Sequence, residues 1–114
     1  MTQTTLLPPA LLDAEKGVLK VSSLDKIANG SVDGYDNAQT GDAITLKVKT
    51  STGNAWEYRF TLTTEPLWPL VFAIPKEVFE KNLVPNATAE LHYVVARFDQ
   101  LIGISKELKV HLER

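Results

Sequence analysis

The chain has 114 residues, close to the size of one average domain, so we expect a single core. Apolar residues make up 44% of it and charged residues 23%, which excludes a disordered tail and a coiled coil, and the absence of cysteine excludes a disulfide scaffold and a thiolate zinc site. A net charge of -2 argues against nucleic-acid binding, and no window approaches the ~20 consecutive apolar residues of a membrane-spanning helix, so we expect no membrane insertion.

Residues 1–16 contain the adjacent prolines Pro8 and Pro9 and no sustained hydrophobic period. We therefore expect an extended lead-in, with little order before Pro8, ahead of a domain spanning residues 17–114. The segment has no basic stretch, and the prolines interrupt the pair Leu6 and Leu7, so it does not match a secretory signal. The localisation stays open.

The segment from Gly17 to Leu24 carries apolar residues at 18, 19, 21 and 24, which predict a short first strand. From Asp25 to Asp42 the composition turns to Asn, Gly, Asp and Ser. This composition predicts a long connection that contains one short strand.

Residues 43–49 and 55–64 show the clearest signal in the chain, a strict alternation of apolar and polar side chains around a turn at Gly53. A period of two places one face of a strand against the core and the other in water, so we predict a hairpin of two strands. The apolar positions expected to face the core are Ile44, Leu46, Val48, Trp56, Tyr58, Phe60 and Leu62.

The second half of the chain predicts a buried strand over residues 70–74, a short helix over 76–83 and two further strands. Only about five residues separate the strand ending near residue 64 from the strand beginning at residue 70, and they reach ~17 Å at most. Either the earlier strand is short and crosses to the other sheet, or the two form a local arch. The last strand is expected over residues 104–113, with these residues on one face: Ile104, Leu108, Val110 and Leu112.

Six or seven short strands with almost no helix predict an all-β fold, an antiparallel β-sandwich of about seven strands with one short helical segment. Gly41 and Asp42 before an alternating strand, followed by an aromatic strand, then FAIPKEVFEKN, ELHYVVA and ISKELKVHL, resemble bacterial immunoglobulin-like (Ig-like) modules. The resemblance covers residues 17–113.

Modules of this family are repeated in large surface-exposed and secreted proteins. The resemblance therefore implies an Ig-like sandwich and a non-catalytic building block for adhesion, display or a spacer role, on the surface or secreted if the chain is part of a larger bacterial protein. It carries over no functional residue. The chain departs from the family in having no tandem repetition and in the apolar connection at residues 98–103.

That connection is the predicted binding surface. A hairpin tip normally carries polar turn residues, yet Phe98, Leu101 and Ile102 gather here, and Trp68 could join them. The partner we expect is another protein or a neighbouring domain. The alternative is that these side chains fold back over the open end of the sandwich as a hydrophobic lid.

The two histidines, His92 and His111, fall on the polar faces of the last two predicted strands. They could meet across the ladder as a weak metal site, but two imidazoles without a third ligand rarely hold zinc. We expect solvated side chains, and we predict no metal, no cofactor and no catalytic residue.

A second set of candidate ligands lies in the loop VDGYDNAQTGD, which supplies carboxylate and amide oxygens of the kind that calcium prefers. Its members are Asp33, Asp36, Asn37 and Asp42. The same residue types are also favoured in turns for backbone reasons, and we favour that interpretation.

The favoured hypothesis is a non-catalytic structural or protein-interaction module. The alternative is a sandwich that binds carbohydrate or another small ligand, which requires the aromatic side chains to converge on one exposed face: Trp56, Tyr58, Trp68 and Tyr93. A small enzyme ranks last, because a base in a plausible pocket is not identifiable.

Overall fold

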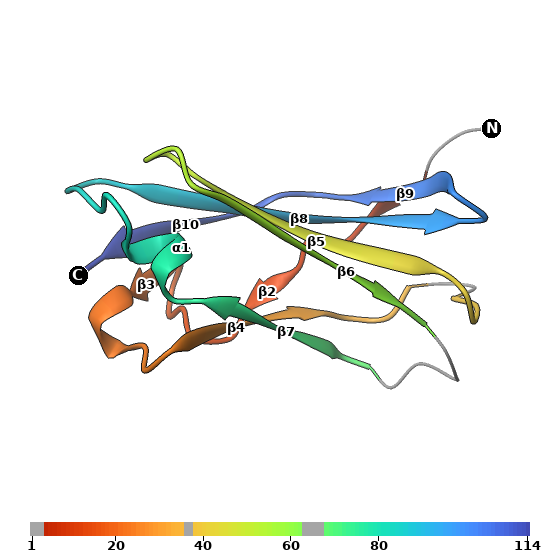
Figure 1. The fold of residues 1–114 in the computed structure, drawn as a ribbon, viewed down its shortest axis with the longest axis horizontal. Coiled ribbons are helices and arrows are strands. Elements are labelled where there is room, and N and C mark those ends of the chain that lie inside the picture. The colour runs from red at the N-terminus through yellow and green to blue at the C-terminus, as the bar shows by residue number, and fades with distance from the viewer. Residues whose placement is uncertain (1–3, 36–37, 63–67) are drawn as a thin grey trace.

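The computed structural model describes residues 4–35, 38–62 and 68–114, and most of them lie in strands (Figure 1). Its elements in chain order are β1 (Thr4–Leu6), β2 (Ala10–Leu11), β3 (Val18–Lys20), the 3-10 turn η1 (Val21–Ser23), β4 (Ile27–Val32), β5 (Ala43–Thr50), β6 (Ala55–Thr61), β7 (Leu70–Pro75), α1 (Glu77–Glu80), β8 (Thr88–Arg97), β9 (Gln100–Ser105) and β10 (Leu108–Glu113). The all-β prediction is confirmed. The described residues form more strands than the predicted seven, because several edge strands have only two or three residues.

The strands form two sheets. In the larger one, β8 pairs with β5 on one side and with β9 and β10 in succession on the other, while β6 extends the sheet beyond β5. The smaller sheet has the order β2-β4-β7. The purely antiparallel prediction is wrong for the larger sheet, since β1 runs parallel to β9 and β3 parallel to β10. Both parallel pairs join the N-terminal segment to the last strands, across the long connection that parallel pairing requires.

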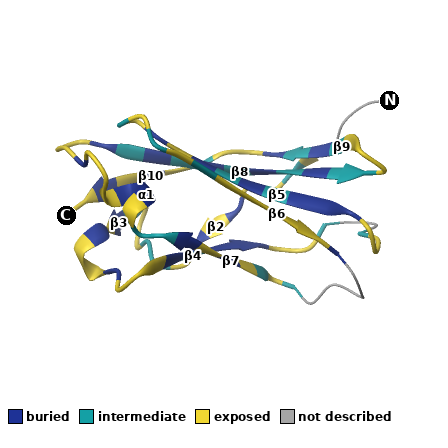
Figure 2. Ribbon diagram, in the orientation of Figure 1, coloured by how far each residue is buried: buried dark blue, intermediate teal, exposed yellow. Residues whose placement is uncertain are grey.

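The core lies between the two sheets, where the buried positions of Figure 2 face inward. Gly30 marks their closest approach, because a Cβ there would lie 2.9 Å from Leu46 Cδ2 and 3.0 Å from Ile74 Cδ1. The predicted alternation of residues 43–49 is confirmed, with the even-numbered side chains of β5 buried. One end of the core is covered by α1, which buries Val78 and Phe79 and is shorter than the helix predicted over residues 76–83.

The predicted strand over residues 104–113 is two strands, because the chain breaks at residues 106–107. Ile104 pairs with Val94 on the outer face, so the prediction that it shares a face with Val110 and Leu112 is wrong. At the break, the hydroxyl of Ser105 accepts a hydrogen bond from the backbone N–H of Tyr93 at 2.8 Å. The side chain thus replaces a missing ladder hydrogen bond, and the alternation restarts in a different phase.

The N-terminal segment contributes to both sheets. β1 pairs with β9 in the larger sheet and β2 pairs with β4 in the smaller one, with Pro8 and Pro9 between them. We predicted little order before Pro8, whereas residues 4–6 pair in register with residues 103–105. The lead-in is extended, as expected, but its strands belong to the sheets.

Candidate functional site

The strand β6 lies at an edge of the larger sheet and carries three aromatic side chains on its inner face, which we call the β6 aromatic row: Trp56, Tyr58 and Phe60. They stand opposite Val48, Leu46 and Ile44 of β5, so the predicted face is the right one. The prediction that these rings are enclosed between two layers is wrong for two of them, since 55% of Tyr58 and 40% of Phe60 is exposed. Among the described residues the smaller sheet has three strands, and Phe72 of β7 contacts Tyr58 without covering it.

A groove of about 560 Å³ runs between β6 and β7, the facing edges of the two sheets. Its lining is apolar or aromatic throughout: Tyr58, Phe60, Pro69, Leu70, Val71, Phe72 and Ala73. Tyr58 joins the two strands by an edge-to-face contact with Phe72, with ring centroids 6.2 Å apart, and stacks on Trp56 at 6.4 Å. The rings are thus held in a fixed arrangement while a large part of their surface stays in contact with water.

Both ends of β6 are anchored to the body of the domain. Before the strand, the side-chain amide of Asn54 donates hydrogen bonds to the carbonyl oxygens of Val78 and Lys81 at 2.9 and 2.8 Å. These carbonyls belong to the end of α1, where helical partners are missing. After the strand, the backbone N–H of Leu62 donates to Asp42 O at 2.9 Å. The edge strand is therefore fixed in place without a neighbour on its second side.

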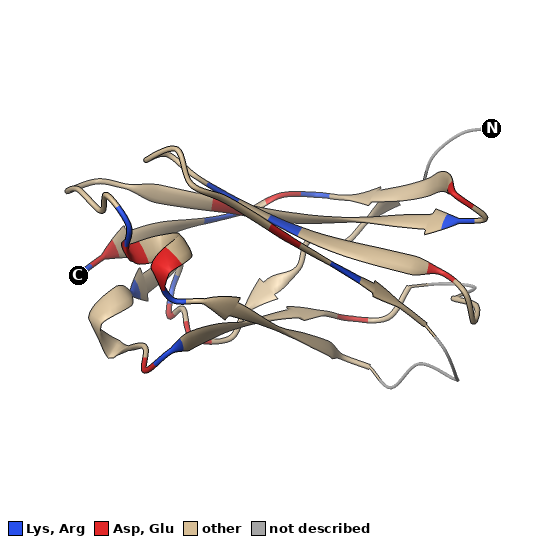
Figure 3. Ribbon diagram, viewed as in Figure 1, with Lys and Arg blue, Asp and Glu red and all other residues tan. Residues whose placement is uncertain are grey.

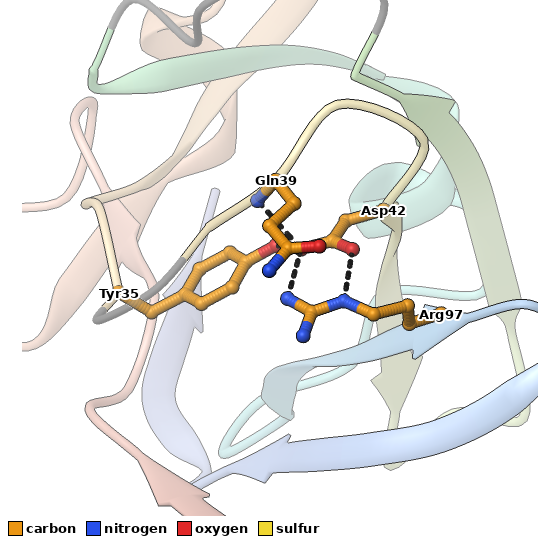
Figure 4. A network of polar contacts seen from close by, with 4 residues as sticks. All are labelled: Tyr35, Gln39, Asp42 and Arg97. Carbon is orange, nitrogen blue, oxygen red and sulfur yellow. Dashed lines mark hydrogen bonds and ion pairs between the residues drawn. The ribbon is translucent and has the colours of Figure 1, made fainter.

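A second cluster, at the other end of β5, is polar and buried (Figure 4). The carboxylate of Asp42 has no exposed surface and accepts hydrogen bonds from Arg97 Nε and Nη2 at 2.8 and 2.9 Å. The hydroxyl of Tyr35 donates to it at 2.6 Å and the backbone N–H of Gln39 at 3.0 Å. This cluster ties the loop before β5 to the end of β8.

The hydrogen bonds from Arg97, and further those from Tyr35 and Gln39, lower the pKa of Asp42 to about 2 against the opposing effect of burial. Burial and the bond to Asp42 raise the pKa of Tyr35, and the same carboxylate raises the pKa of Arg97. At neutral pH the cluster is an ion pair with a neutral phenol. The pKa values of Tyr35, Asp42 and Arg97 are therefore shifted by the contacts that these three side chains make with one another and by burial.

The structure describes two of the four candidate calcium ligands, Asp33 and Asp42. Asp42 is fully engaged with Arg97 and Tyr35, and Asp33 is exposed. Asp36 and Asn37 lie outside the described residues. Within residues 4–35, 38–62 and 68–114 no group of three or more acidic or histidine side chains is placed to hold a metal ion.

The two histidines do not face each other. His92 stands opposite Lys47 of β5, and His111 opposite Thr88 of β8. Both lie on the paired strands β8 and β10, but the register places His111 opposite Thr88, four positions from His92 along β8. The condition for a shared metal site is therefore not met.

The residues predicted to form a contact surface separate into two pairs. Phe98 is 91% exposed and Leu101 40% exposed, whereas Ile102 and Trp68 pack against the core. Trp68 contacts Tyr35 edge to face, with ring centroids 5.6 Å apart. The lid interpretation thus describes Ile102 and Trp68, and the exposed-contact interpretation describes Phe98 and Leu101.

The connection that carries Phe98 is tighter than predicted. Phe98 and Asp99 form a two-residue turn between β8 and β9, with φ values of 52° and 62°, and Leu101 already belongs to β9. Two successive residues with positive φ define the hairpin turn that favours Asn and Gly. A phenylalanine in that position is conformationally unfavourable, so turn propensity does not account for it.

The four aromatic residues required by the carbohydrate hypothesis do not converge. Tyr93 is buried in the core, and Trp68 packs at the loop that carries Tyr35. Trp56 and Tyr58 alone remain together at the surface, in the β6 aromatic row.

Comparison with models of known protein families, with curated proteins and with solved structures finds no match to this chain. Within the part of the chain that the structure describes, we find no helix of sufficient length and apolar character to cross a bilayer.

Proposed function

We propose that this chain is a non-catalytic protein-interaction module with an Ig-like arrangement of strands, and that its contact surface is the β6 edge with the groove beside it. The observation that carries the proposal is the β6 aromatic row, a set of rings held rigidly at the edge of a sheet and left half in water. Large exposed apolar surface on a fixed scaffold is the usual mark of a contact site.

The order of the strands supports the Ig-like part of the proposal. In an Ig sandwich one sheet contains the first, second, fourth and fifth strands of the fold, and the other contains the third, sixth and seventh, to which variable-type domains add strands that follow the third. Here β2, β4 and β7 share the smaller sheet, whereas β5, β8 and the β9–β10 strand share the larger one with β6. Among the described residues no strand lies on the free side of β7, which leaves the groove open.

The resemblance to bacterial Ig-like modules is what supports a place in a surface or secreted bacterial protein, in an adhesion, display or spacer role. The polar cluster around Asp42 supports the non-catalytic part, because its charged groups satisfy one another inside the fold. The exposed pair Phe98 and Leu101 offers a second, smaller contact point on the β8–β9 hairpin.

Carbohydrate binding is the second candidate function. The parallel, partly exposed rings of Trp56 and Tyr58 favour it, since sugar rings stack on such surfaces. The groove lining counts against it, because the hydroxyl of Tyr58 is its one polar side-chain group and a sugar needs several hydrogen-bonding groups to fix its orientation.

A thermal-shift panel separates the two functions. The chain is heated with extended peptides whose alternate residues are apolar and with a panel of glycans; a ligand that binds the folded state raises Tm as its concentration exceeds Kd. We expect peptides to raise the Tm of the wild type and to lose this effect in Tyr58→Ser. The matched control Val84→Ser, which removes an exposed apolar side chain outside the groove, should respond as the wild type does.

Glycans that raise Tm through Trp56, with peptides giving no shift, would establish the carbohydrate function instead. A chain that responds to neither panel and does not self-associate would contradict a contact role for the β6 edge.

A further inference from the structure

The four outer edges of the two sheets differ in how well they are protected against pairing. Natural proteins blunt edges with short strands, prolines, bulges and charged side chains, lysine above all; β6 carries two charged residues of opposite sign, Glu57 and Arg59. On three of these edges such a device is present. β1 and β3, which share one edge of the larger sheet, have three residues each, and β2 has two. β7 follows Pro69 and ends at Pro75. β6 has seven residues, Ala55–Thr61, without proline, glycine or lysine, and pairs with β5 in one unbroken register.

The hydrogen-bond pattern sharpens the contrast between β7 and β6. Lys76 N–H donates to Lys26 O at 3.0 Å, so the even-numbered residues of β7 bond to β4 and the odd-numbered ones face outward. Pro69 and Pro75 occupy outward-facing positions and have no N–H to donate. The free edge of β7 is thus blocked at both ends.

On β6 the outward-facing positions all carry donors. Thr50 N–H donates to Asn54 O, and Leu62 N–H to Asp42 O, both at 2.9 Å, so the even-numbered residues of β6 bond to β5. The N–H and C=O groups of the odd-numbered residues therefore point away from the sheet: Ala55, Glu57, Arg59 and Thr61. Another strand can pair there only if it offers its own outward-facing residues opposite these.

We propose that the occupant of this edge is a second copy of the chain, paired antiparallel through β6 about a two-fold axis at Tyr58. The inference rests on the proposed function, that the β6 edge is a contact surface, and names its partner. In this register Glu57 stands opposite Arg59 of the second copy, and symmetry repeats the pair, as an isologous contact requires. Figure 3 shows the acidic and the basic position next to each other on β6.

The charges select this register from its neighbours. A shift by two residues keeps outward-facing positions opposite one another but brings either Glu57 opposite Glu57 or Arg59 opposite Arg59, and like charges directly opposite destabilise a ladder. On its other side Glu57 stands opposite Lys47 of β5, so pairing places it between two cations. Arg59 has one exposed partner in the monomer, Asp99 at 3.8 Å, a surface pair that contributes little.

The inner face of the pair is aromatic. Tyr58 stands opposite Tyr58 at the axis, and Trp56 opposite Phe60 of the second copy. These are non-hydrogen-bonded pairs, in which side chains approach most closely, and cross-strand aromatic pairs stabilise a sheet. The rings that are half exposed in one copy gain an aromatic neighbour across the new strand pair.

The decisive test uses charge reversal and analytical ultracentrifugation. Glu57→Arg and Arg59→Glu each bring like charges together twice, so each variant alone should raise the dimer Kd about tenfold or more. A mixture of the two restores opposite charges at both positions, and we expect a heterodimer with the wild-type Kd. Lys109→Glu, an equal charge change on β10, is the matched control and should dimerise normally.

A cross-link measures the register. The chain has no cysteine, so Tyr58→Cys can form a disulfide only with a second copy. The axis places these two positions opposite each other, and we expect oxidised dimers for Tyr58→Cys and none for Phe60→Cys. Circular dichroism of each variant establishes that it is folded.

A wild type that stays monomeric at concentrations of about 1 mM, or variants that leave the dimer Kd unchanged, would overturn the self-pairing. If the peptide panel still raises Tm in that case, the contact role of the edge stands and its partner is a different chain. If neither is seen, both proposals fail together.

Discussion

Asp42→Asn is expected to destabilise the fold more than any other conservative change at a charged residue. The substitution removes the charge that Arg97 and Tyr35 face while keeping the size of the side chain. An amide still accepts one hydrogen bond, but its nitrogen presents donors to the donors of Arg97. The guanidinium, three-quarters buried, is left without the carboxylate that its charge requires.

The magnitude follows from the lowered pKa. A carboxyl whose pKa falls from 3.8 to about 2 on folding gains about 2 kcal/mol from ionisation, since a tenfold change in an equilibrium constant is worth about 1.4 kcal/mol. Because the folded-state pKa is the lower one, this stability is present above about pH 4 and is lost as the pH falls towards about 2. We expect Asp42→Asn to lose about 2–3 kcal/mol at pH 7, at the lower limit of what breaking a buried pair costs.

Urea unfolding followed by tryptophan fluorescence at several pH values between about 2 and 7 measures both effects. Trp68 lies against Tyr35 and reports on the cluster directly. The difference between wild type and Asp42→Asn should shrink as the pH falls from about 4 to about 2, because the wild-type carboxyl then protonates. The exposed Asp25→Asn is the matched control, and Tyr35→Phe should cost about 1–2 kcal/mol through one lost bond to the carboxylate.

This expectation is wrong if the free energy of unfolding of Asp42→Asn lies within about 0.5 kcal/mol of the wild-type value at pH 7. A difference of that size is typical of surface substitutions. The expectation is also wrong if the difference between the two proteins is the same at low and at neutral pH. Either result would mean that the ion pair adds nothing to the folded state beyond its desolvation cost.

Three further variants test the β8–β9 hairpin. Replacing Phe98 and Asp99 by Asn and Gly should stabilise the domain by about 1 kcal/mol, because both positions have positive φ. We expect a raised urea midpoint with an unchanged m-value, and a lowered midpoint would contradict this. The free energy of unfolding of Leu101→Ser should stay within about 0.5 kcal/mol of the wild-type value. Ile102→Ser loses a contact with the core and should lower it by more than about 1 kcal/mol. Equal losses would contradict the difference in burial between the two side chains.

Much of the fold follows from the sequence because period-two alternation is a local property. Ile44, Leu46 and Val48 alternate without interruption, and β5 forms there with those side chains buried. Alternation fails where a break changes its phase, as at Ser105, whose hydroxyl replaces a ladder bond and turns Ile104 to the outer face. Nothing in the spacing of residues 104–112 marks that break.

The alternation also leaves open how wide the covering sheet is. It assigns Tyr58 and Phe60 to the inner face, which is right, but burial depends on whether a strand of the other sheet lies above them. The number of strands in each sheet is a property of the whole chain. For this reason the sequence pattern assigns the exposed rings of β6 to the core. Of the predicted surface at residues 98–102, Phe98 and Leu101 are exposed and Ile102 packs against the core.

The polar cluster shows a similar limit. Asp42 was assigned to a turn or a calcium loop because Asp, Gly and Asn surround it, and both interpretations use neighbours in sequence. Its actual partner, Arg97, lies 55 positions away. An arginine directly after the apolar end of an alternating strand, as Arg97 follows Val94, Val95 and Ala96 in β8, is the signal that could have pointed to a buried acid.

The parallel pairing of the chain ends has a mechanical consequence. β1 runs parallel to β9, and β3 parallel to β10, so a force that draws residue 4 and residue 113 apart along the strands slides each pair lengthwise (Figure 1). Under such a load the hydrogen bonds of a pair bear the tension together, whereas peeling a hairpin open breaks them one after another. A domain with its ends arranged in this way resists extension from its termini more strongly than its thermal stability alone indicates.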